Sequence, residues 1–177
     1  PLGTIDFQNT LAKNGCTADI VLAGTNTLLF ACRAVQPGHV HVSGQKNDIL
    51  VSAYPSRKND IVLAAIQQYL PEYRMVPDIL SVSLDNLNFE FHPGPTLLYT
   101  AMIENGLDFE YYSDFTPSQA RLIEAIDQER LALCRAYGIP VRNVAQTFHD
   151  EYGYEGTLYE MIKHADVYKG IKGPSTL

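Results

Sequence analysis

Strand patterns occupy the first half of the chain and are nearly absent from the second half. Three segments have the composition of strands: residues 19–24 and 49–54 are short apolar runs, and residues 39–44 show β-branched alternation. The first run ends at a glycine, as a buried parallel strand often does. Beyond about residue 90 the pattern favours helices. The sequence therefore predicts an α/β portion followed by an all-α portion, with the boundary between residues 83 and 90.

The remaining segments of the first half give weaker predictions. Residues 27–35 read as a short apolar helix or loop, and residues 75–77 and 79–83 read as short extended pieces. Asn59 has the character of a helix N-cap, and the helix that follows is expected to present one apolar face as far as Tyr69. This half is expected to alternate short strands with short helices.

The second half contains clear signals for the start and the end of helices. A capping box begins at Thr116 and places proline at the first helical position, and the helix it starts is expected to end near Gly138. The apolar side chains expected to face inward are Leu122, Ile123, Ile126, Leu133 and Cys134. The charged side chains expected to face mostly outward are Glu124, Asp127, Glu129 and Arg130. Further helices are expected at residues 93–105, 143–152 and 157–169.

Charge and cysteine content restrict the partners and the compartment. The 177 residues carry 13 Lys and Arg against 20 Asp and Glu, which gives a net charge of −7. Nucleic acids and anionic membranes both attract basic faces, so neither is expected as a partner. The cysteines are widely spaced and the histidines are scattered, which favours a reducing compartment and argues against a metal site. No apolar run of about 18 residues and no secretory signal is visible, so we expect a cytoplasmic protein.

One histidine stands at the expected boundary between the two portions. His92 lies in a polar segment, directly before Pro93, which disfavours helical backbone at the histidine. A helix is expected to start there, and the positive end of its dipole would keep the imidazole neutral near pH 7. A neutral imidazole can accept a proton during oxidation and return it during reduction. His92 is therefore a candidate acid/base, and the alternative is a histidine that caps the helix or bonds a loop.

A second polar segment follows the first predicted strand. Residues 24–33 read Gly-Thr-Asn-Thr-Leu-Leu-Phe-Ala-Cys-Arg, and open α/β sheets bind ligands beyond the carboxyl ends of their strands. Asn26, Thr27 and Arg33 could bind a polar ligand there. The alternative is a capped turn, with Cys32 as a small core side chain and Arg33 in solvent.

Motifs for other chemistries are absent. The chain has neither G-x-G-x-x-G nor G-x-x-x-x-G-K-[ST], so no phosphate-cradling loop is visible. It also lacks G-x-S-x-G, so nothing specific favours a nucleophilic hydrolase.

Taken together, several segments resemble the octopine/nopaline (opine) dehydrogenases in order and spacing. The segments are residues 24–33, Val-Ser-Ala-Tyr-Pro at 51–55, Ser-Leu-Asp-Asn-Leu-Asn at 83–88, His92-Pro93, Ile-Glu-Asn-Gly at 103–106, Thr-Pro-Ser at 116–118 and Ile-Asp-Gln-Glu-Arg at 126–130. The resemblance extends over nearly the whole chain. No single segment is specific for the family, but the combination of segments is.

This resemblance implies a fold, a reaction and a set of site residues. Residues 1–84 would form the second part of a Rossmann-like NAD(P)-binding domain, and residues 85–177 a truncated helical substrate domain. The implied reaction is the condensation of an amino acid with a 2-oxo acid, often pyruvate, with reduction by NADH or NADPH. His92 would be the catalytic acid/base. The implied substrate-binding residues are Asn26, Cys32, Asn86 and Asn88, and the cofactor-binding residues are Thr27 and Arg33.

The chain departs from the family pattern at both ends. The family begins with a strand and a glycine-rich turn, and it continues past the position of Leu177 with an arginine and an acidic residue that serve the substrate and the histidine. We therefore interpret the chain as a fragment, which alone should bind nucleotide weakly.

Two alternatives stay open from the sequence. One is a non-enzymatic helical module for binding or oligomerisation, because the long helix after Thr116 could pair with a second copy in a homodimer. The other is a related two-domain dehydrogenase of the ketopantoate-reductase type. Enzymes of that type usually place a lysine near the hydride centre, and no lysine occurs between Lys58 and Lys163, which counts against this alternative.

Overall fold

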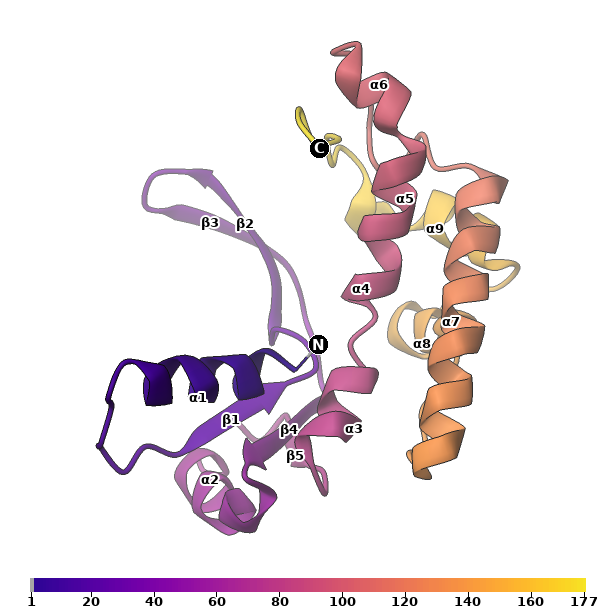
Figure 1. Ribbon diagram of the computed structural model, residues 1–177. Coiled ribbons are helices and arrows are strands. Elements are labelled where there is room, and N and C mark those ends of the chain that lie inside the picture. Colours follow the sequence, from indigo (N-terminus) through magenta and orange to yellow (C-terminus); the bar gives the residue numbers. More distant parts are fainter. Residues whose placement is uncertain (1) are drawn as a thin grey trace. The chain divides into compact units, whose positions relative to one another are not determined.

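The computed structural model describes residues 2–177, apart from the side chains of Ser43, Glu151 and Tyr152, and divides into two compact units. The first unit, which we call the sheet unit, ends at Asn86, and the second, the helical unit, begins at Leu87. The expected domain boundary lay after residue 84. Figure 1 shows the elements of both units along the chain.

The sheet unit is built around one central strand. Its elements are α1 (Gly3–Lys13), β1 (Leu22–Thr25), β2 (Phe30–Gln36), β3 (His39–Gln45), β4 (Ile49–Tyr54), a 3₁₀ turn (Ser56–Lys58), α2 (Asn59–Ile66), β5 (Tyr73–Met75) and α3 (Ile79–Leu84). The strand β4 pairs antiparallel with β1 and parallel with β5, and β2 and β3 form a separate antiparallel hairpin. The predicted strand at residues 49–54 is confirmed.

Helices cover both faces of β4, which explains why its sequence is apolar apart from the buried Ser52. On one face Val51 and Ala53 pack with Val62 of α2. On the other face Leu50 and Tyr54 pack against the cluster that includes Ile79 and Val82 of α3, together with Ile5 of α1. In Figure 1 the helices α1 and α2 lie on opposite sides of the sheet.

Two expectations for residues 19–36 were wrong. The strand β1 is shorter than predicted, runs antiparallel to β4 and is partly exposed, because it pairs with β4 alone. Residues 30–36, expected within a helix or loop, form β2 and pair with β3 through register pairs such as Cys32 with Val42. The β-branched alternation of β3 provides a pairing partner, and tertiary pairing of this kind overrides weak local propensity. The strand at residues 39–44 is confirmed.

The helix predictions around β4 also needed correction. Asn59 is the first residue of α2 and not its cap; its side chain accepts a hydrogen bond from Ala53 N at 2.7 Å and donates to Val76 O at 3.1 Å. The helix ends at Ile66, before Tyr69. Residues 79–83, expected to be extended, lie in α3, because Asp78 caps that helix. The helix α1 was not predicted.

The helices of the helical unit begin and end close to the capping and stop signals in the sequence. Its elements are α4 (Asn88–Phe91), α5 (Pro93–Leu98), α6 (Thr100–Glu104), α7 (Pro117–Tyr137), α8 (Val144–Tyr152), α9 (Leu158–His164) and a 3₁₀ turn (Asp166–Tyr168). The capping box at Thr116 and the end of α7 at Gly138, whose φ of 67° suits glycine, are confirmed. The helix expected at 93–105 is divided into α5 and α6, and α9 is shorter than predicted.

One aromatic core holds the helical unit together. Its buried rings are Phe91, Tyr99, Phe109, Tyr111, Tyr112, Phe115 and Phe148. Ile123 and Cys134 of α7 are buried as predicted, whereas Leu133 is 45% exposed. Gly94 of α5 lies so close to α7 that a Cβ atom there would meet Leu122 Cδ2 at 3.0 Å.

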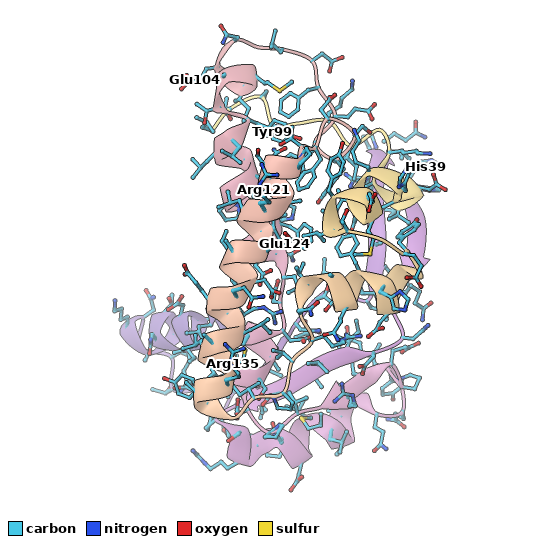
Figure 2. All side chains as sticks on the ribbon, turned by 90° about the vertical axis from the view of Figure 1, so that its right-hand side faces the viewer. His39, Tyr99, Glu104, Arg121, Glu124 and Arg135 are labelled. Carbon is cyan, nitrogen blue, oxygen red and sulfur yellow. The ribbon has the colours of Figure 1, made fainter. Side chains whose placement is uncertain are left out.

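The charged face of α7 does not point outward as a whole. Arg121, Glu124 and Arg135 lie along its exposed side (Figure 2). Asp127 and Arg130 were expected to be mostly outward, but they are only 1% and 4% exposed. This expectation was wrong because both side chains find charged partners inside the unit.

Candidate active site

His92 lies at the junction of two short helices. It follows the last residue of α4 and precedes the first residue of α5, with φ −106° and ψ −58°. The expectation that Pro93 would keep His92 out of the helical region was wrong. The main chain instead stays helical through the junction: His92 N donates to Asn88 O, and Thr96 N donates to His92 O, both at 3.1 Å.

The imidazole is exposed but partly desolvated. His92 is exposed at the surface of the helical unit, and its side chain makes no capping hydrogen bond to α5. Desolvation by the atoms packed around the ring lowers the pKa of His92 below its ordinary value. The ring of Tyr111 is one of these neighbours, with the two ring centroids 6.0 Å apart. The imidazole is therefore neutral near pH 7 and exposed to solvent within the helical unit.

A buried tyrosine forms hydrogen bonds to the main-chain carbonyls at this junction. Tyr111, which is 5% exposed, places its hydroxyl oxygen 2.9 Å from Phe91 O and 3.0 Å from His92 O. The same oxygen lies 2.9 Å from Thr96 Oγ1. Sequence reasoning missed Tyr111, because nothing in the local pattern links it to a segment about twenty residues earlier.

Two residues before His92, a carboxyl group enters a buried charge cluster. Glu90 Oε1 lies 2.7 Å from Arg130 Nε, and Arg130 Nη2 lies 2.6 Å from Asp127 Oδ1. Arg130 Nη2 also donates to Arg142 O at 2.6 Å, and Asp127 Oδ2 accepts a hydrogen bond from Val144 N at 3.0 Å. The cluster thus joins α4 to α7 and to the start of α8.

Glu90 is the member of this cluster whose carboxylate oxygens lack well-aligned hydrogen-bond donors in the described part of the chain. Its side chain is completely buried, and neither carboxylate oxygen has a well-aligned hydrogen-bond donor among the groups that the structure describes, even though its ion pair with Arg130 is short. Burial raises the pKa of Glu90 to about 7, against the opposing charge of Arg130 and with help from the like charge of Asp127. The spacing of Ile123, Asp127, Arg130 and Cys134 along one stripe of α7 was the sequence signal for these buried charges.

Within the sheet unit, two of the polar segments come together. Asn26 is 8% exposed; its Nδ2 donates to Asp85 Oδ2 at 2.8 Å, and its Oδ1 accepts from Leu50 N at 3.0 Å. The amide of Asn26 therefore links the end of β1 to the segment after α3. Beside it, Lys46 Nζ donates to Thr27 Oγ1 at 3.0 Å.

The other predicted site residues are more exposed. Cys32 and Arg33 lie on the hairpin strand β2, where every residue is exposed, so the alternative of Cys32 as a core side chain is wrong. Asn86 is half-buried at the end of the sheet unit, and Asn88 is exposed at the first residue of α4. These four positions are accessible to a ligand within their own units.

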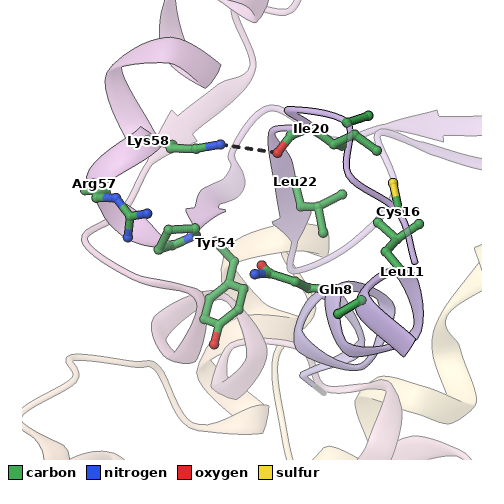
Figure 3. A pocket seen from close by; sticks show the side chains of 11 residues that line it. Gln8, Leu11, Cys16, Ile20, Leu22, Tyr54, Arg57 and Lys58 are labelled. Atoms are coloured by element: carbon green, nitrogen blue, oxygen red, sulfur yellow. Dashed lines mark hydrogen bonds between the residues drawn. The ribbon is translucent and has the colours of Figure 1, made fainter. Parts of the chain in front are cut away.

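A pocket of about 430 Å³ opens in the sheet unit, between α1, β1 and the end of β4 (Figure 3). Tyr54, Arg57 and Lys58 belong to its lining. Lys58 Nζ pairs with Asp19 at 3.0 Å and donates to Ile20 O at 3.3 Å. The predicted site residues are not among those that line this pocket, so it lends them no support.

Two further properties concern the described part of the chain. Residues 2–177 contain, among the side chains that the structure describes, no group of three or more from His, Cys, Asp and Glu arranged to hold a metal ion. No helix among them combines the length and the apolar character that crossing a membrane requires.

Comparison with known proteins gives consistent results. Residues 75–177 match the family described as NAD/NADP octopine/nopaline dehydrogenase, alpha-helical domain. An opine dehydrogenase of Arthrobacter sp. (strain 1C) is 36% identical over 177 residues, covering 99% of this chain and 49% of that protein. The chain therefore spans about half the length of the relatives it matches.

Solved structures share the fold. Octopine dehydrogenase with NADH and L-arginine has a TM-score of 0.70 at 21% identity, over 97% of this chain and 47% of that one. NADP⁺-bound yersinopine dehydrogenase has a TM-score of 0.64 at 13% identity, over 96% and 49%. These structures support the predicted fold class, a partial nucleotide-binding region followed by a helical domain. Because the family match spans more than half of the chain, the protein belongs to the octopine/nopaline dehydrogenase family.

Proposed function

We propose that this chain is part of an oxidoreductase of the opine dehydrogenase type, which joins an amino acid to a 2-oxo acid with reduction by NADH or NADPH. Residues 1–84 would belong to the nucleotide-binding domain and residues 85–177 to the helical substrate domain. The observation that carries the proposal is the neutral, exposed imidazole of His92 at the α4–α5 junction, inside the segment that matches the family. Pyruvate is the proposed 2-oxo acid, since octopine dehydrogenase has been solved with NADH and pyruvate.

The proposed cofactor residues have suitable chemistry for an anionic dinucleotide. Thr27 Oγ1 lies 3.0 Å from the ammonium group of Lys46, and Arg33 is exposed on β2. Cationic and hydroxyl donors of this kind suit the ribose and phosphate groups of NAD or NADP. When bound, the nicotinamide supplies the hydride. Asn26, Cys32, Asn86 and Asn88 are the proposed substrate contacts, in line with the resemblance.

His92 would move the proton that accompanies hydride transfer. In the oxidative direction the neutral ring accepts a proton at a ring nitrogen from the substrate, and in the reductive direction it returns that proton. Its lowered pKa supports the neutral resting form. The protein thereby contributes orientation and proton transfer at a defined atom.

Replacement of His92 tests the proposal. In the intact protein, His92→Ala should lower kcat by about 10²- to 10⁴-fold, the usual loss for one well-placed acid/base group, while NADH affinity measured by calorimetry stays unchanged. His164→Ala removes another exposed histidine of the helical unit and should leave kcat near the wild-type value. Wild-type turnover in His92→Ala would contradict the proposal.

A further inference from the structure

The segment that carries His92 contains a main-chain carbonyl without its usual helical donor. In a continuous helix, Phe91 O would accept a hydrogen bond from the N–H four residues later. That residue is Pro95, which has no N–H. Phe91 is 6% exposed, so water is a poor replacement for this donor, and an unpaired buried carbonyl is costly.

The hydroxyl of Tyr111 occupies the place of the missing donor. It has a single proton, which lies between Phe91 O at 2.9 Å and His92 O at 3.0 Å. Because that proton is committed to these carbonyls, the consistent assignment is that Thr96 Oγ1 donates to the Tyr111 oxygen across 2.9 Å. One phenol thus binds three residues of the α4–α5 junction.

Tyr111 is itself held in place from several sides. Its N–H donates to Ile171 O at 2.7 Å, and its carbonyl accepts from Tyr99 Oη at 2.8 Å. Its ring packs against the rings of Tyr99 and Tyr112, with centroid distances of 5.4 and 5.0 Å. A tyrosine fixed in this way can transmit the rigidity of the aromatic core to the main chain at His92.

We infer that Tyr111 is a positioning residue for His92: its hydroxyl replaces the donor that Pro95 lacks and fixes the backbone from which the imidazole projects. The inference rests on the proposed function, in which His92 transfers the proton. Orientation of an acid/base group matters at this level, because a displacement of about 1 Å can cost about 10²-fold in rate.

The first test is Tyr111→Phe in the intact protein, which removes only the hydroxyl. We expect kcat to fall by about 10- to 100-fold, while KM for NADH stays within about twofold, because orientation and not binding is lost. Tyr154→Phe is the matched control. It removes a hydroxyl that accepts from Asp166 N elsewhere in the same unit, and kcat should stay near wild type. Unchanged kcat in Tyr111→Phe would overturn the inference.

The second test restores the missing donor. Pro95→Ala returns an N–H that can donate to Phe91 O, although it also trims a buried side chain and costs some stability. In a double-mutant cycle, Tyr111→Phe should therefore reduce kcat less in the Pro95→Ala background than in wild type. If the losses of kcat in the two single variants simply add in the double variant, the phenol does not substitute for a backbone donor. This comparison holds even if one of the single variants is less stable, because the cycle isolates the coupling between the two positions.

A spectroscopic measurement separates this inference from the proposed function. The NMR signal of the His92 ring, identified by its loss in His92→Ala, should shift and broaden in Tyr111→Phe and stay unchanged in Tyr154→Phe. If His92→Ala keeps full turnover while the ring signal responds to Tyr111→Phe, the proposed function fails and the positioning contact stands. If His92→Ala is inactive and neither kcat nor the ring signal responds to Tyr111→Phe, the positioning role alone is overturned.

Discussion

The helical unit and the sheet unit fix their side chains by different means. In the helical unit one aromatic core runs continuously from Phe91 to Ile162 and encloses charged groups as well. In the sheet unit the apolar clusters are small and centred on β4, and β2 is exposed along its whole length. The comparison teaches that a side chain near His92 is held by dense packing, whereas one on the hairpin is held mainly by strand pairing.

The largest effect should come from breaking the buried charge cluster. Arg130→Leu leaves the carboxylates of Glu90 and Asp127 without their cation, which typically costs about 3–5 kcal/mol. Urea unfolding of the chain measures the loss. Arg135→Leu makes the same change on the exposed side of α7, and it should alter the free energy of unfolding by less than about 0.5 kcal/mol. Equal losses in the two variants would show that the core of the helical unit does not depend on this cluster.

A smaller effect should appear in the pH dependence of stability. Burial raises the pKa of Glu90 from 4.5 to about 7. Protonation of this carboxyl therefore stabilises the folded state relative to the unfolded state. This contribution is fully present below pH 4.5 and is lost as the pH rises through about 7, a change of about 3 kcal/mol. Glu90→Gln, which cannot ionise, should lack this decline when unfolding is followed from pH 4 to 8.

The matched control for that titration is Glu124→Gln, at an exposed carboxyl on α7. Its stability should follow the wild-type curve within about 0.5 kcal/mol at every pH. A Glu90→Gln curve parallel to wild type would mean that Glu90 stays ionised inside the cluster throughout this range.

The smallest effect is expected on the hairpin. Val42 is 52% exposed, so Val42→Thr should change the free energy of unfolding by less than about 0.5 kcal/mol. The same substitution at Val144, which is 2% exposed in the helical unit, buries a hydroxyl and should cost about 1–3 kcal/mol. A cost above about 1 kcal/mol for Val42→Thr in the intact protein would show that the hairpin is packed against other residues there.

Local signals predicted some elements of the fold well. The capping box at Thr116, the stop at Gly138 and the strand at residues 49–54 all depend on short-range chemistry, and all were predicted. The strand β2 and the helix α3 were mispredicted, because pairing with β3 and a cap at Asp78 decide their states. Short apolar segments are ambiguous until such partners are known.

The residues of the candidate site likewise fall into those that local sequence signals identify and those that depend on distant partners. His92 could be singled out from its position before Pro93 in a polar segment, and the family resemblance named the same residue. The stripe on α7 signals that Arg130 is buried, but neither the role of Tyr111 nor the pairing of Arg130 with Glu90 could be predicted, because both contacts span a sequence separation that periodicity does not encode. Charged residues on a helix are normally solvated, so a buried arginine contradicts the usual expectation.

The close approach of α5 to α7 at Gly94 makes the helix spacing depend on the absence of a methyl group. A β-carbon at this position would touch Leu122 and also Ile126, at 3.0 and 3.3 Å. Either α7 side chain would have to yield, or the first turn of α5 would be displaced outward. Since that turn begins one residue after His92, a methyl group at position 94 would shift the histidine only where Leu122 and Ile126, which meet it with the ends of flexible side chains, do not move by a few tenths of an ångström.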